Sequence, residues 1–331
     1  IQVQSAREVA QLQEWFEDHW AEGKEVSDAV MQIIERHTRH YSPFDVYAKA
    51  LQEFFKGHAL TSNEWDETES KMFPQLDRYQ QEAYWSLMKI ANQHDGAFLC
   101  DGVGLGKTFV GLMLIERLVI HEGKRVVLFA PKATKDGVWL PHLSRWLPQV
   151  GGAGGAADFS NLAVFSHTDF ARKGDFPERF ERISELADVV IIDEAHHFRN
   201  PGTMGNPEED IEPSRYHKLF KLLHESTRPK KLFMLTATPI NNRLTDFRHL
   251  AELFTKKDEQ YFAKTLGVNN LTSHFSKMER ALQKAVGHDV TDTSEYMKEA
   301  QALLEADEVI KELVVQRSRS YVRASQEKEK G

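Results

Sequence analysis

The sequence contains one cysteine, Cys100, and it has no apolar run near the ~18 residues that a membrane-spanning helix needs. A single cysteine excludes an internal disulfide and fits a reducing compartment such as the cytosol. Because this cysteine has no closely spaced histidine or cysteine partners, the sequence also disfavours a structural zinc site. No basic segment followed by an apolar stretch opens the chain, so we expect no secretory signal, no membrane association and a cytoplasmic location.

The charge of the chain is acidic overall but uneven along its length. The 331 residues carry a formal net charge of −8, and residues 1–75 hold 7 Lys and Arg against 14 Asp and Glu. Residues 228–280, by contrast, hold 10 Lys and Arg against 5 Asp and Glu. This basic segment, which includes Lys231 and Arg243, predicts either a track for nucleic-acid phosphates or simply a solvated helical surface.

Three segments of the chain differ in pattern. Residues 1–75 predict helices followed by an acidic linker, "ALTSNEWDETES". Between residues 76 and 254, short apolar runs alternate with helix-length segments, which predicts a three-layer α/β domain with helices on both faces of a parallel sheet. The expected strands are "AFLC", "RVVLFAP", "LAVFS", "DVVIID" and "KLFMLTAT". Strand signals stop after about residue 244, so residues 255–331 predict helices only. The chain begins at Ile1 rather than Met, and we expect it to be a piece of a longer protein.

The stretch "FLCDGVGLGKTFV", residues 98–110, joins a predicted strand to a predicted helix, which is the context of a phosphate-binding P-loop. Gly102, Gly104 and Gly106 would let backbone N–H groups approach phosphate oxygens at the start of the helix. The strict P-loop pattern has glycine where this sequence has Asp101. Taken alone, the stretch also fits an ordinary tight turn between a strand and a helix.

Two further groups of side chains predict ATP and Mg²⁺ as cofactors. Lys107 would neutralise the β- and γ-phosphates, and the hydroxyl of Thr108 would hold Mg²⁺. In "VVIIDEAHH", Asp193 would position the metal and Glu194 would polarise the attacking water. An acidic pair that only caps the next helix is the alternative, but it does not explain the P-loop upstream. His196 is spaced to lie between the nucleotide and a neighbouring strand, or it is a surface imidazole.

Six ordered segments resemble the motifs of superfamily two helicases, and they look most like the Swi/Snf-type branch of DNA-translocating ATPases. The segments are "LDRYQQEAYWSLM", "DGVGLGKT", "VVLFAPKATKDGVWLPHLSRW", "VFSHTDF", "DEAHHFRN" and "LTATPINNRLTDFRHLAELF". That branch commonly has aspartate at the position of Asp101. The resemblance covers roughly residues 76–254 and implies a RecA-like ATP-binding domain.

The resemblance also implies roles at matching positions. Gln80 resembles the glutamine that reads adenine, with Arg78 beside the base, although a glutamine at a helix start is ordinarily a polar surface residue. Thr236 and Thr238 resemble the pair that couples the γ-phosphate to DNA, and His196 would belong with them. Contacts to the phosphate backbone of double-stranded DNA, without sequence preference, are implied or proposed for Lys132, Ser166, His167, Asn241, Asn242 and Arg243.

Some residues suit structural roles better than functional ones. Trp139 and Trp146 are seven positions apart, and this helical spacing favours core packing over stacking on bases. Cys100 lies at the end of a predicted strand, where a small buried apolar residue is expected rather than a nucleophile.

The segments that flank the ATP-binding region carry weaker resemblances. Residues 255–312 resemble the helical protrusion of these translocases, and "IKELVVQRSRSYV" resembles the segment that leads into their second RecA-like domain. No arginine-finger motif follows, so we expect half a motor that is weak or inactive alone. The segment "SPFDVYAKALQEFF" resembles a region of bacterial helicases that carry a phospholipase D-like domain, although the HxKxxxxD signature is absent.

The sequence therefore predicts the ATP-binding half of an ATP-dependent translocase on double-stranded DNA in the bacterial cytoplasm. The weaker resemblance implies a role in DNA restriction or phage defence. A nucleotide-dependent scaffold that does not hydrolyse ATP is one alternative, against which Lys107, Asp193 and Glu194 argue. An RNA helicase is the other, and the "LTATPINN" stretch favours duplex DNA over RNA.

Overall fold

The computed structural model describes most of the chain from residue 64 onward, together with a short N-terminal helical segment. The described residues are 10, 13–17, 64–150, 161–171, 176–225, 228–237, 244–286, 307–317, 321–322 and 325. Residues 1–59 and 60–331 form two compact units. In the first unit the described residues are helical, and the second unit contains the sheet and the predicted P-loop.

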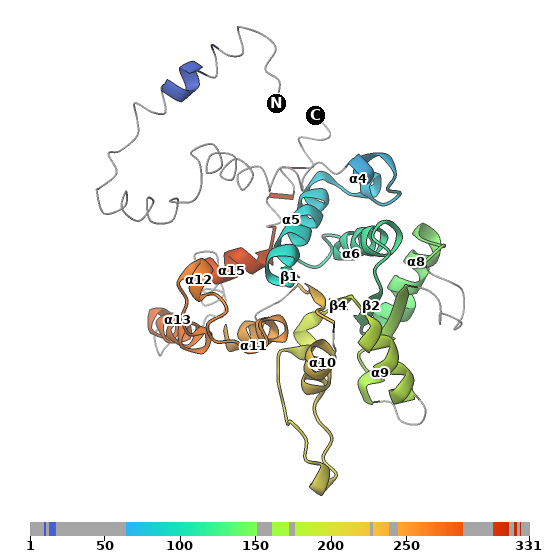
Figure 1. The fold of residues 1–331 in the computed structure, drawn as a ribbon, viewed down its shortest axis with the longest axis vertical. Helices are drawn as coiled ribbons and strands as arrows, with labels where there is room; N and C mark the ends of the chain where they lie inside the picture. The colour runs from blue at the N-terminus through green and yellow to red at the C-terminus, as the bar shows by residue number, and fades with distance from the viewer. Residues whose placement is uncertain are drawn as a thin grey trace, which may run out of the picture. The chain divides into compact units, whose positions relative to one another are not determined.

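The second unit is built on a six-stranded sheet in which every pairing is parallel (Figure 1). Its strands are β1 (Gly96–Leu99), β2 (Val126–Ala130), β3 (Leu162–Ser166), β4 (Val189–Asp193), β5 (Lys231–Leu235) and β6 (Val314–Val315). They lie in the order β3-β2-β4-β5-β1-β6. The five strands expected from the apolar runs are confirmed, because each run forms a strand of this buried sheet.

The sixth strand corrects the expectation that the chain is purely helical beyond residue 244. Val314 and Val315 pair with Phe98 and Leu99 of β1 in parallel register. Two residues are too few to show a strand pattern in the sequence, and they directly follow a helix. The extended conformation here arises from pairing with the edge of the sheet, which no local pattern encodes.

Helices cover both faces of the sheet, as Figure 1 shows. The α-helices are α4 (Glu64–Thr68), α5 (Arg78–His94), α6 (Lys107–Ile115), α7 (Lys132–Thr134), α8 (Leu140–Trp146), α9 (Phe176–Leu186), α10 (Arg215–His224), α11 (Leu244–Thr255), α12 (Ala263–Leu266), α13 (Leu271–Val286) and α15 (Glu308–Leu313). Short 3₁₀ or π-helical turns are η1 (Phe73–Gln75), η2 (Glu116–His121), η3 (Lys135–Trp139), η5 (Asp169–Ala171), η6 (Ala195–Phe198) and η7 (Pro207–Glu209). No helix of the described residues is both long and apolar enough to cross a membrane.

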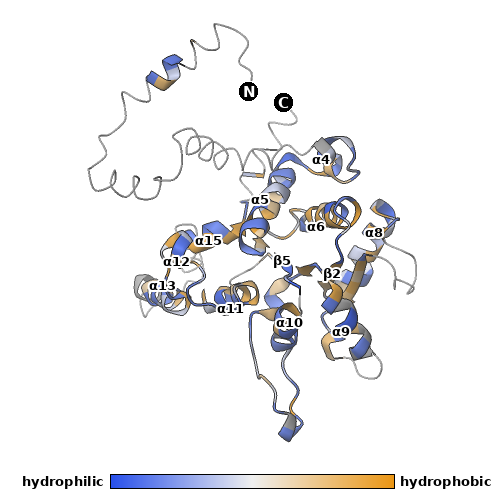
Figure 2. Cartoon of the chain, viewed as in Figure 1, coloured by the Kyte–Doolittle hydropathy of each residue, from blue (hydrophilic) through white to orange (hydrophobic). Residues whose placement is uncertain are grey.

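Alternate residues of each strand enter two separate cores. Leu99 packs with α5, α6 and α8, whereas Phe98 packs with α9, α10, α11 and α13. This alternation follows from the two-residue period of side chains in a strand. Figure 2 shows the hydrophobic sides of the helices turned toward the sheet. The predicted three-layer, RecA-like α/β arrangement is thereby confirmed.

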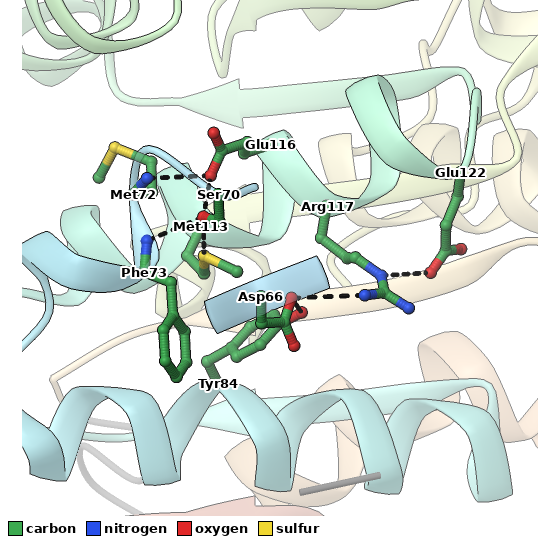
Figure 3. Close-up of polar contacts among 9 residues, drawn as sticks. All are labelled: Asp66, Ser70, Met72, Phe73, Tyr84, Met113, Glu116, Arg117 and Glu122. Atoms are coloured by element: carbon green, nitrogen blue, oxygen red, sulfur yellow. Dashed lines mark hydrogen bonds and ion pairs between the residues drawn. The ribbon is translucent and has the colours of Figure 1, made fainter. Parts of the chain in front are cut away.

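Residues 64–76, whose first part was expected to be acidic linker, pack on the helix that follows the P-loop. Glu116 is almost fully buried, and its carboxylate accepts a hydrogen bond from the hydroxyl of Ser70 (Figure 3). The same carboxylate accepts the backbone N–H groups of Lys71 at 2.9 Å and Met72 at 3.0 Å. One buried carboxylate therefore holds three donors of the segment that leads into α5.

A second buried carboxylate holds α4. Asp66 accepts hydrogen bonds from the hydroxyl of Tyr84 at 3.0 Å and from the guanidinium of Arg117 at 3.3 Å (Figure 3). Arg117 also donates to Glu122 at 3.0 Å and lies over the ring of Trp65. Burial raises the pKa of Asp66, and its two partners oppose that shift. The acidic character of this stretch thus reflects specific buried contacts as well as exposed charge.

Replacing Glu116 with alanine should destabilise the second unit by about 3–5 kcal/mol, because three buried donors lose a charged acceptor. Urea unfolding of the chain measures the change. The matched control is Glu225→Ala, since Glu225 pairs with Lys221 on the exposed surface of α10, where such a pair contributes about 0.5 kcal/mol or less. Equal losses in the two variants would contradict the structural role of Glu116.

Candidate functional site

The glycine-rich turn runs from the end of β1 to the start of α6. Gly104 and Gly106 have φ angles of 84° and 77°, in the left-handed region that side chains other than glycine rarely adopt. A Cβ on Gly106 would also lie 2.2 Å from Nε2 of Gln80. At Gly102 a Cβ would make an ordinary 3.7 Å contact with Leu105, so the conformation requires glycine at the later two positions only.

Lys107 is the first residue of α6, and its ammonium lies over the turn. Nζ donates to the backbone oxygen of Asp101 at 2.9 Å and to that of Gly102 at 3.3 Å. Thr108 follows it in the first helical turn, and both side chains are partly exposed. A cation and a hydroxyl therefore stand at the N-terminus of a helix, where the helix dipole favours an anion.

Gln80 connects the start of α5 to the same turn. Its side-chain oxygen accepts the N–H of Asp77 at 3.0 Å in a capping box, and its amide nitrogen donates to the backbone oxygen of Leu105 at 3.1 Å. The hydroxyl of Tyr79 donates to that same oxygen at 3.1 Å. Arg78 is exposed and pairs with Glu82 at 3.5 Å. Gln80 is thus buried against the turn and is not a surface residue.

The acidic pair lies where β4 ends. Asp193 is buried, and its carboxylate accepts the indole N–H of Trp139 at 2.8 Å and the backbone N–H of Glu194 at 3.0 Å. Burial raises the pKa of Asp193, the Trp139 hydrogen bond lowers it, and the nearby Glu194 charge raises it. Glu194 has a φ of 50°, so the chain turns sharply here and its side chain is partly exposed.

His196 joins this acidic pair to the end of β5. Its Nδ1 lies 3.1 Å from a carboxylate oxygen of Glu194 and 3.2 Å from the hydroxyl of Thr236. Burial is the main cause that lowers the pKa of His196, so the neutral imidazole is favoured near pH 7. The backbone N–H of Thr236 donates to Leu99 of β1 at 3.0 Å. A chain of contacts therefore runs from Glu194 through His196 to the strand beside the P-loop.

The parallel sheet brings these groups together at the carboxyl ends of its strands. Both β1 and β4 pair with β5, and all three run in the same direction, so the P-loop and Asp193 leave the sheet at the same end. The charge of Lys107 is near enough to lower the pKa of Asp193. No group of three or more His, Cys, Asp and Glu suited to a metal ion occurs among the described residues. The oxygens of Thr108 and Asp193 fit Mg²⁺, which usually takes one or two protein ligands alongside phosphates and water.

The residues expected to contact DNA differ in exposure. Lys132 is exposed at the start of α7. Ser166 and His167 are each 3% exposed. The hydroxyl of Ser166 lies 2.7 Å from that of Thr168, and the ring of His167 packs edge-on against Phe198. Burial lowers the pKa of His167 to about 3, so this imidazole is neutral. Contact of Ser166 or His167 side chains with DNA stays a prediction that would require their exposure.

The described lysines at the start of the basic segment do not lie at this end of the sheet. Thr238, Asn241, Asn242 and Arg243 lie outside the described residues. Lys231 opens β5 and contacts Asn92, and the preceding Lys230 donates to the backbone oxygens of residues 185 and 187. Both lysines therefore stand at the amino end of the strand, opposite the P-loop. Lys231 therefore lies at the end of the strands opposite to a DNA track beside the nucleotide.

Two residues of the site had no functional assignment from sequence. Trp139 is fully buried, as its helical spacing predicted, but its N–H also holds Asp193. Asp101 is fully buried, and its carboxylate accepts the backbone N–H of Arg317 at 2.8 Å. The sequence carries a signal at Asp101, because an aspartate there departs from the regular P-loop pattern. Nothing in the sequence links Trp139 to Asp193. Cys100 is buried as expected, and burial raises its pKa.

Gly111 provides the space in which Trp139 reaches Asp193. A Cβ on Gly111 would lie 2.5 Å from the Trp139 ring and 3.1 Å from Leu235. Gly111→Ala should therefore destabilise the domain by about 1–3 kcal/mol through overpacking, measured by urea unfolding. In the control, Gly137→Ala, the added Cβ meets nothing within 4 Å, so better helix propensity should stabilise by up to about 1 kcal/mol. A comparable gain in stability from Gly111→Ala would contradict this expectation, because it would show that the Trp139 ring moves aside for the added Cβ.

Two curated relatives each match about half of the chain. Over 169 residues the chain is 30% identical to "Uncharacterized ATP-dependent helicase YqhH" of Bacillus subtilis, a match that covers 50% of this chain and 27% of that protein. Over 188 residues it is 29% identical to "RNA polymerase-associated protein RapA" of Vibrio cholerae serotype O1, which covers 49% and 18% respectively. The chain therefore spans about a quarter or less of the length of these curated relatives.

A solved structure and a protein-family profile also match the chain. The Sulfolobus solfataricus SWI2/SNF2 ATPase core in complex with double-stranded DNA is 18% identical, with a TM-score of 0.48, covering 75% of this chain and 46% of that one. The profile of the family described as type III restriction enzyme, res subunit, matches residues 73–241, about half of the chain and the span from Gln80 to Thr236. The chain therefore belongs to this family, ResIII.

Proposed function

We propose that this chain is the ATP-binding half of a motor that uses ATP and Mg²⁺ to translocate on double-stranded DNA. One observation carries the proposal. The carboxyl ends of β1, β4 and β5 lie together, and they bring together Lys107, Asp193, Glu194 and His196. A cation at a helix N-terminus faces a carboxylate pair across one intervening strand. This arrangement suits a polyphosphate held between the two.

Each side chain has a proposed part. Lys107 and the amides of the turn would bind the β- and γ-phosphates, Thr108 and Asp193 would hold Mg²⁺, and Glu194 would orient and deprotonate the attacking water. When bound, Mg²⁺ supplies charge neutralisation of the phosphate oxygens. Trp139 keeps the Asp193 carboxylate oriented and favours its ionised form, as metal binding requires.

The adenine and coupling assignments rest on position. Gln80 and Arg78 lie at the start of α5 beside the turn, where a base attached to the bound phosphates would be expected. Because both ends of the Gln80 amide are bonded within the protein, adenine recognition requires exchange of at least one of those bonds. His196 and Thr236, with Thr238, would report the state of the γ-phosphate to the following strand and loop.

The substrate proposal is double-stranded DNA, contacted through its phosphates. Exposed Lys132 supports it, and we assign Ser166, His167, Asn241, Asn242 and Arg243 to the same track on the family resemblance alone. The family description, a restriction enzyme subunit, supports a role of the parent protein in DNA restriction or phage defence. Such an enzyme would meet its DNA in the bacterial cytoplasm.

A second RecA-like domain of the same parent chain is the proposed partner. In the proposed site, Lys107, Asp193 and Glu194 would face the phosphates from one side. Hydrolysis in related P-loop enzymes also needs an arginine on the far side of the γ-phosphate, which contributes about 10³–10⁵ in rate.

Lys107→Ala should abolish detectable binding of Mg-ATP, because one ammonium faces several phosphate oxygens and makes charge-assisted hydrogen bonds to them. Isothermal titration calorimetry of the chain measures the affinity. The control is Lys221→Ala, which removes an exposed lysine of α10 that pairs with Glu225. Unchanged affinity in Lys107→Ala would show that the turn is not the phosphate site.

Residues 1–331 alone should hydrolyse ATP slowly, with little stimulation by DNA. Joining the following domain of the parent protein should raise steady-state turnover by about 10³-fold or more, and Glu194→Gln should cancel that rise. Duplex DNA and duplex RNA added in parallel distinguish the two polymers, and no hydrolysis with either would favour a scaffold. Turnover of several per second by the isolated chain with DNA would contradict the half-motor proposal.

A further inference from the structure

Asp101 is a fully buried carboxylate at a position where the regular P-loop has glycine. One of its oxygens, Oδ1, accepts the backbone N–H of Arg317 at 2.8 Å, across 216 residues of sequence. The proposed phosphate contacts do not use this side chain. Its contact reaches the segment by which the chain leaves the sheet, residues 314–317, which we call the exit segment.

The exit segment is joined to the P-loop side of the sheet at successive points. Val314 and Val315 pair with β1 as strand β6, and the N–H of Cys100 donates to the backbone oxygen of Val315 at 2.8 Å. The Arg317–Asp101 hydrogen bond then continues this pairing into the turn itself. The last residues before the glycine-rich turn and the last residues of the sheet are therefore one hydrogen-bonded unit.

Two buried polar atoms at this junction have no hydrogen-bond partner among the described residues. They are Oδ2 of Asp101 and Nη1 of Arg317. Burial raises the pKa of Asp101, and the charge of Arg317 is the largest influence that lowers it. A carboxyl group and a guanidinium thus stand at the same junction, and neither of these two atoms has a hydrogen bond.

Lys107 provides the link to the nucleotide. Its ammonium donates to the backbone oxygen of Asp101 at 2.9 Å, and its charge also lowers the pKa of the Asp101 carboxyl. Binding of a triphosphate would draw this ammonium toward the phosphate oxygens. The backbone of Asp101 would then lose a partner, and Arg317 would remain as the main cation beside its carboxylate.

We propose that Asp101 is a positioning residue that couples phosphate binding at Lys107 to the exit segment, through closure of its carboxylate on the guanidinium of Arg317. The inference rests on the proposed function of the turn as an ATP site. Nucleotide binding thereby tightens the hold on residues 314–317. In the parent protein this is the route along which the first half of the motor would orient the second half.

Amide hydrogen exchange at Arg317 tests the proposal, measured by mass spectrometry with residue-level fragmentation on the chain with and without Mg-ATP. In the wild-type chain, Mg-ATP should slow exchange at this amide about tenfold or more, since a charge-assisted contact contributes at least about 1.4 kcal/mol, a tenfold factor. Asp101→Asn should keep the protection seen without nucleotide, because the amide oxygen still accepts the Arg317 N–H. It should lose the additional slowing by Mg-ATP.

Two further variants make the outcome decisive. Arg317→Met retains the backbone donor and removes the guanidinium, so it should also lose the nucleotide effect, even if Asp101→Asn fails to fold. Glu312→Gln is the matched control and should keep the effect, because Glu312 pairs with His94 and Gln93 of α5 beside the same segment rather than with the turn. Persistence of the slowing in Arg317→Met, or its absence in a wild-type chain that binds Mg-ATP by calorimetry, would overturn the coupling. A wild-type chain that does not bind Mg-ATP would instead overturn the proposed function.

Discussion

Parallel pairing of β1 and β4 with β5 is the constraint on which the site depends. Neighbouring strands of a sheet lie about 4.8 Å apart, so the ends of β1 and β4 are separated by roughly 10 Å. That separation leaves room for phosphate groups and a metal ion between the turn that follows β1 and the carboxylate at the end of β4. The residue directly after the intervening strand is Thr236, whose hydroxyl lies 3.2 Å from Nδ1 of His196. The sheet therefore sets both the size of the site and the residue that lies at its centre.

The helix that begins at Lys107 also helps to position the start of α5, which carries Gln80. Directly after α6, Glu116 accepts three donors from the segment before α5, and its neighbour Arg117 contacts Asp66 of α4. A buried carboxylate is costly unless its hydrogen bonds are complete, so these contacts tolerate little displacement. Because α5 begins two residues before Gln80, these contacts hold Gln80 from the side of the preceding segment. Its hydrogen bond to Leu105 holds it from the side of the turn. The buried acidic residues thus act on the geometry of the site without touching it.

The sequence could predict the features that are local. Five strands were visible as apolar runs, and the P-loop was visible from its glycines and Lys107. Contacts between distant segments were not visible: nothing near Val314 indicates a strand, because its partner is β1. The packing of residues 64–76 was missed for the same reason, since the acidic stretch resembles a linker until Arg117 and Glu116 are placed beside it. The roles given to the site residues remain predictions, because side-chain geometry alone does not identify a ligand.

Several polar groups of the site already have partners within the protein, so a bound ATP would have to compete with these partners. Lys107 bonds to the oxygens of its own turn, Gln80 to Leu105, and His196 to Glu194. Each such bond contributes only about 1 kcal/mol net, because water is the competing partner. A phosphate offers charge-assisted hydrogen bonds that are roughly twice as strong, so exchange at Lys107 favours the ligand. The neutral bond of Gln80 to Leu105 has no such advantage when the competitor is adenine. For the proposed ATP site we therefore expect phosphate recognition to contribute most of the affinity, and the base to act mainly as a selector once the phosphates are held.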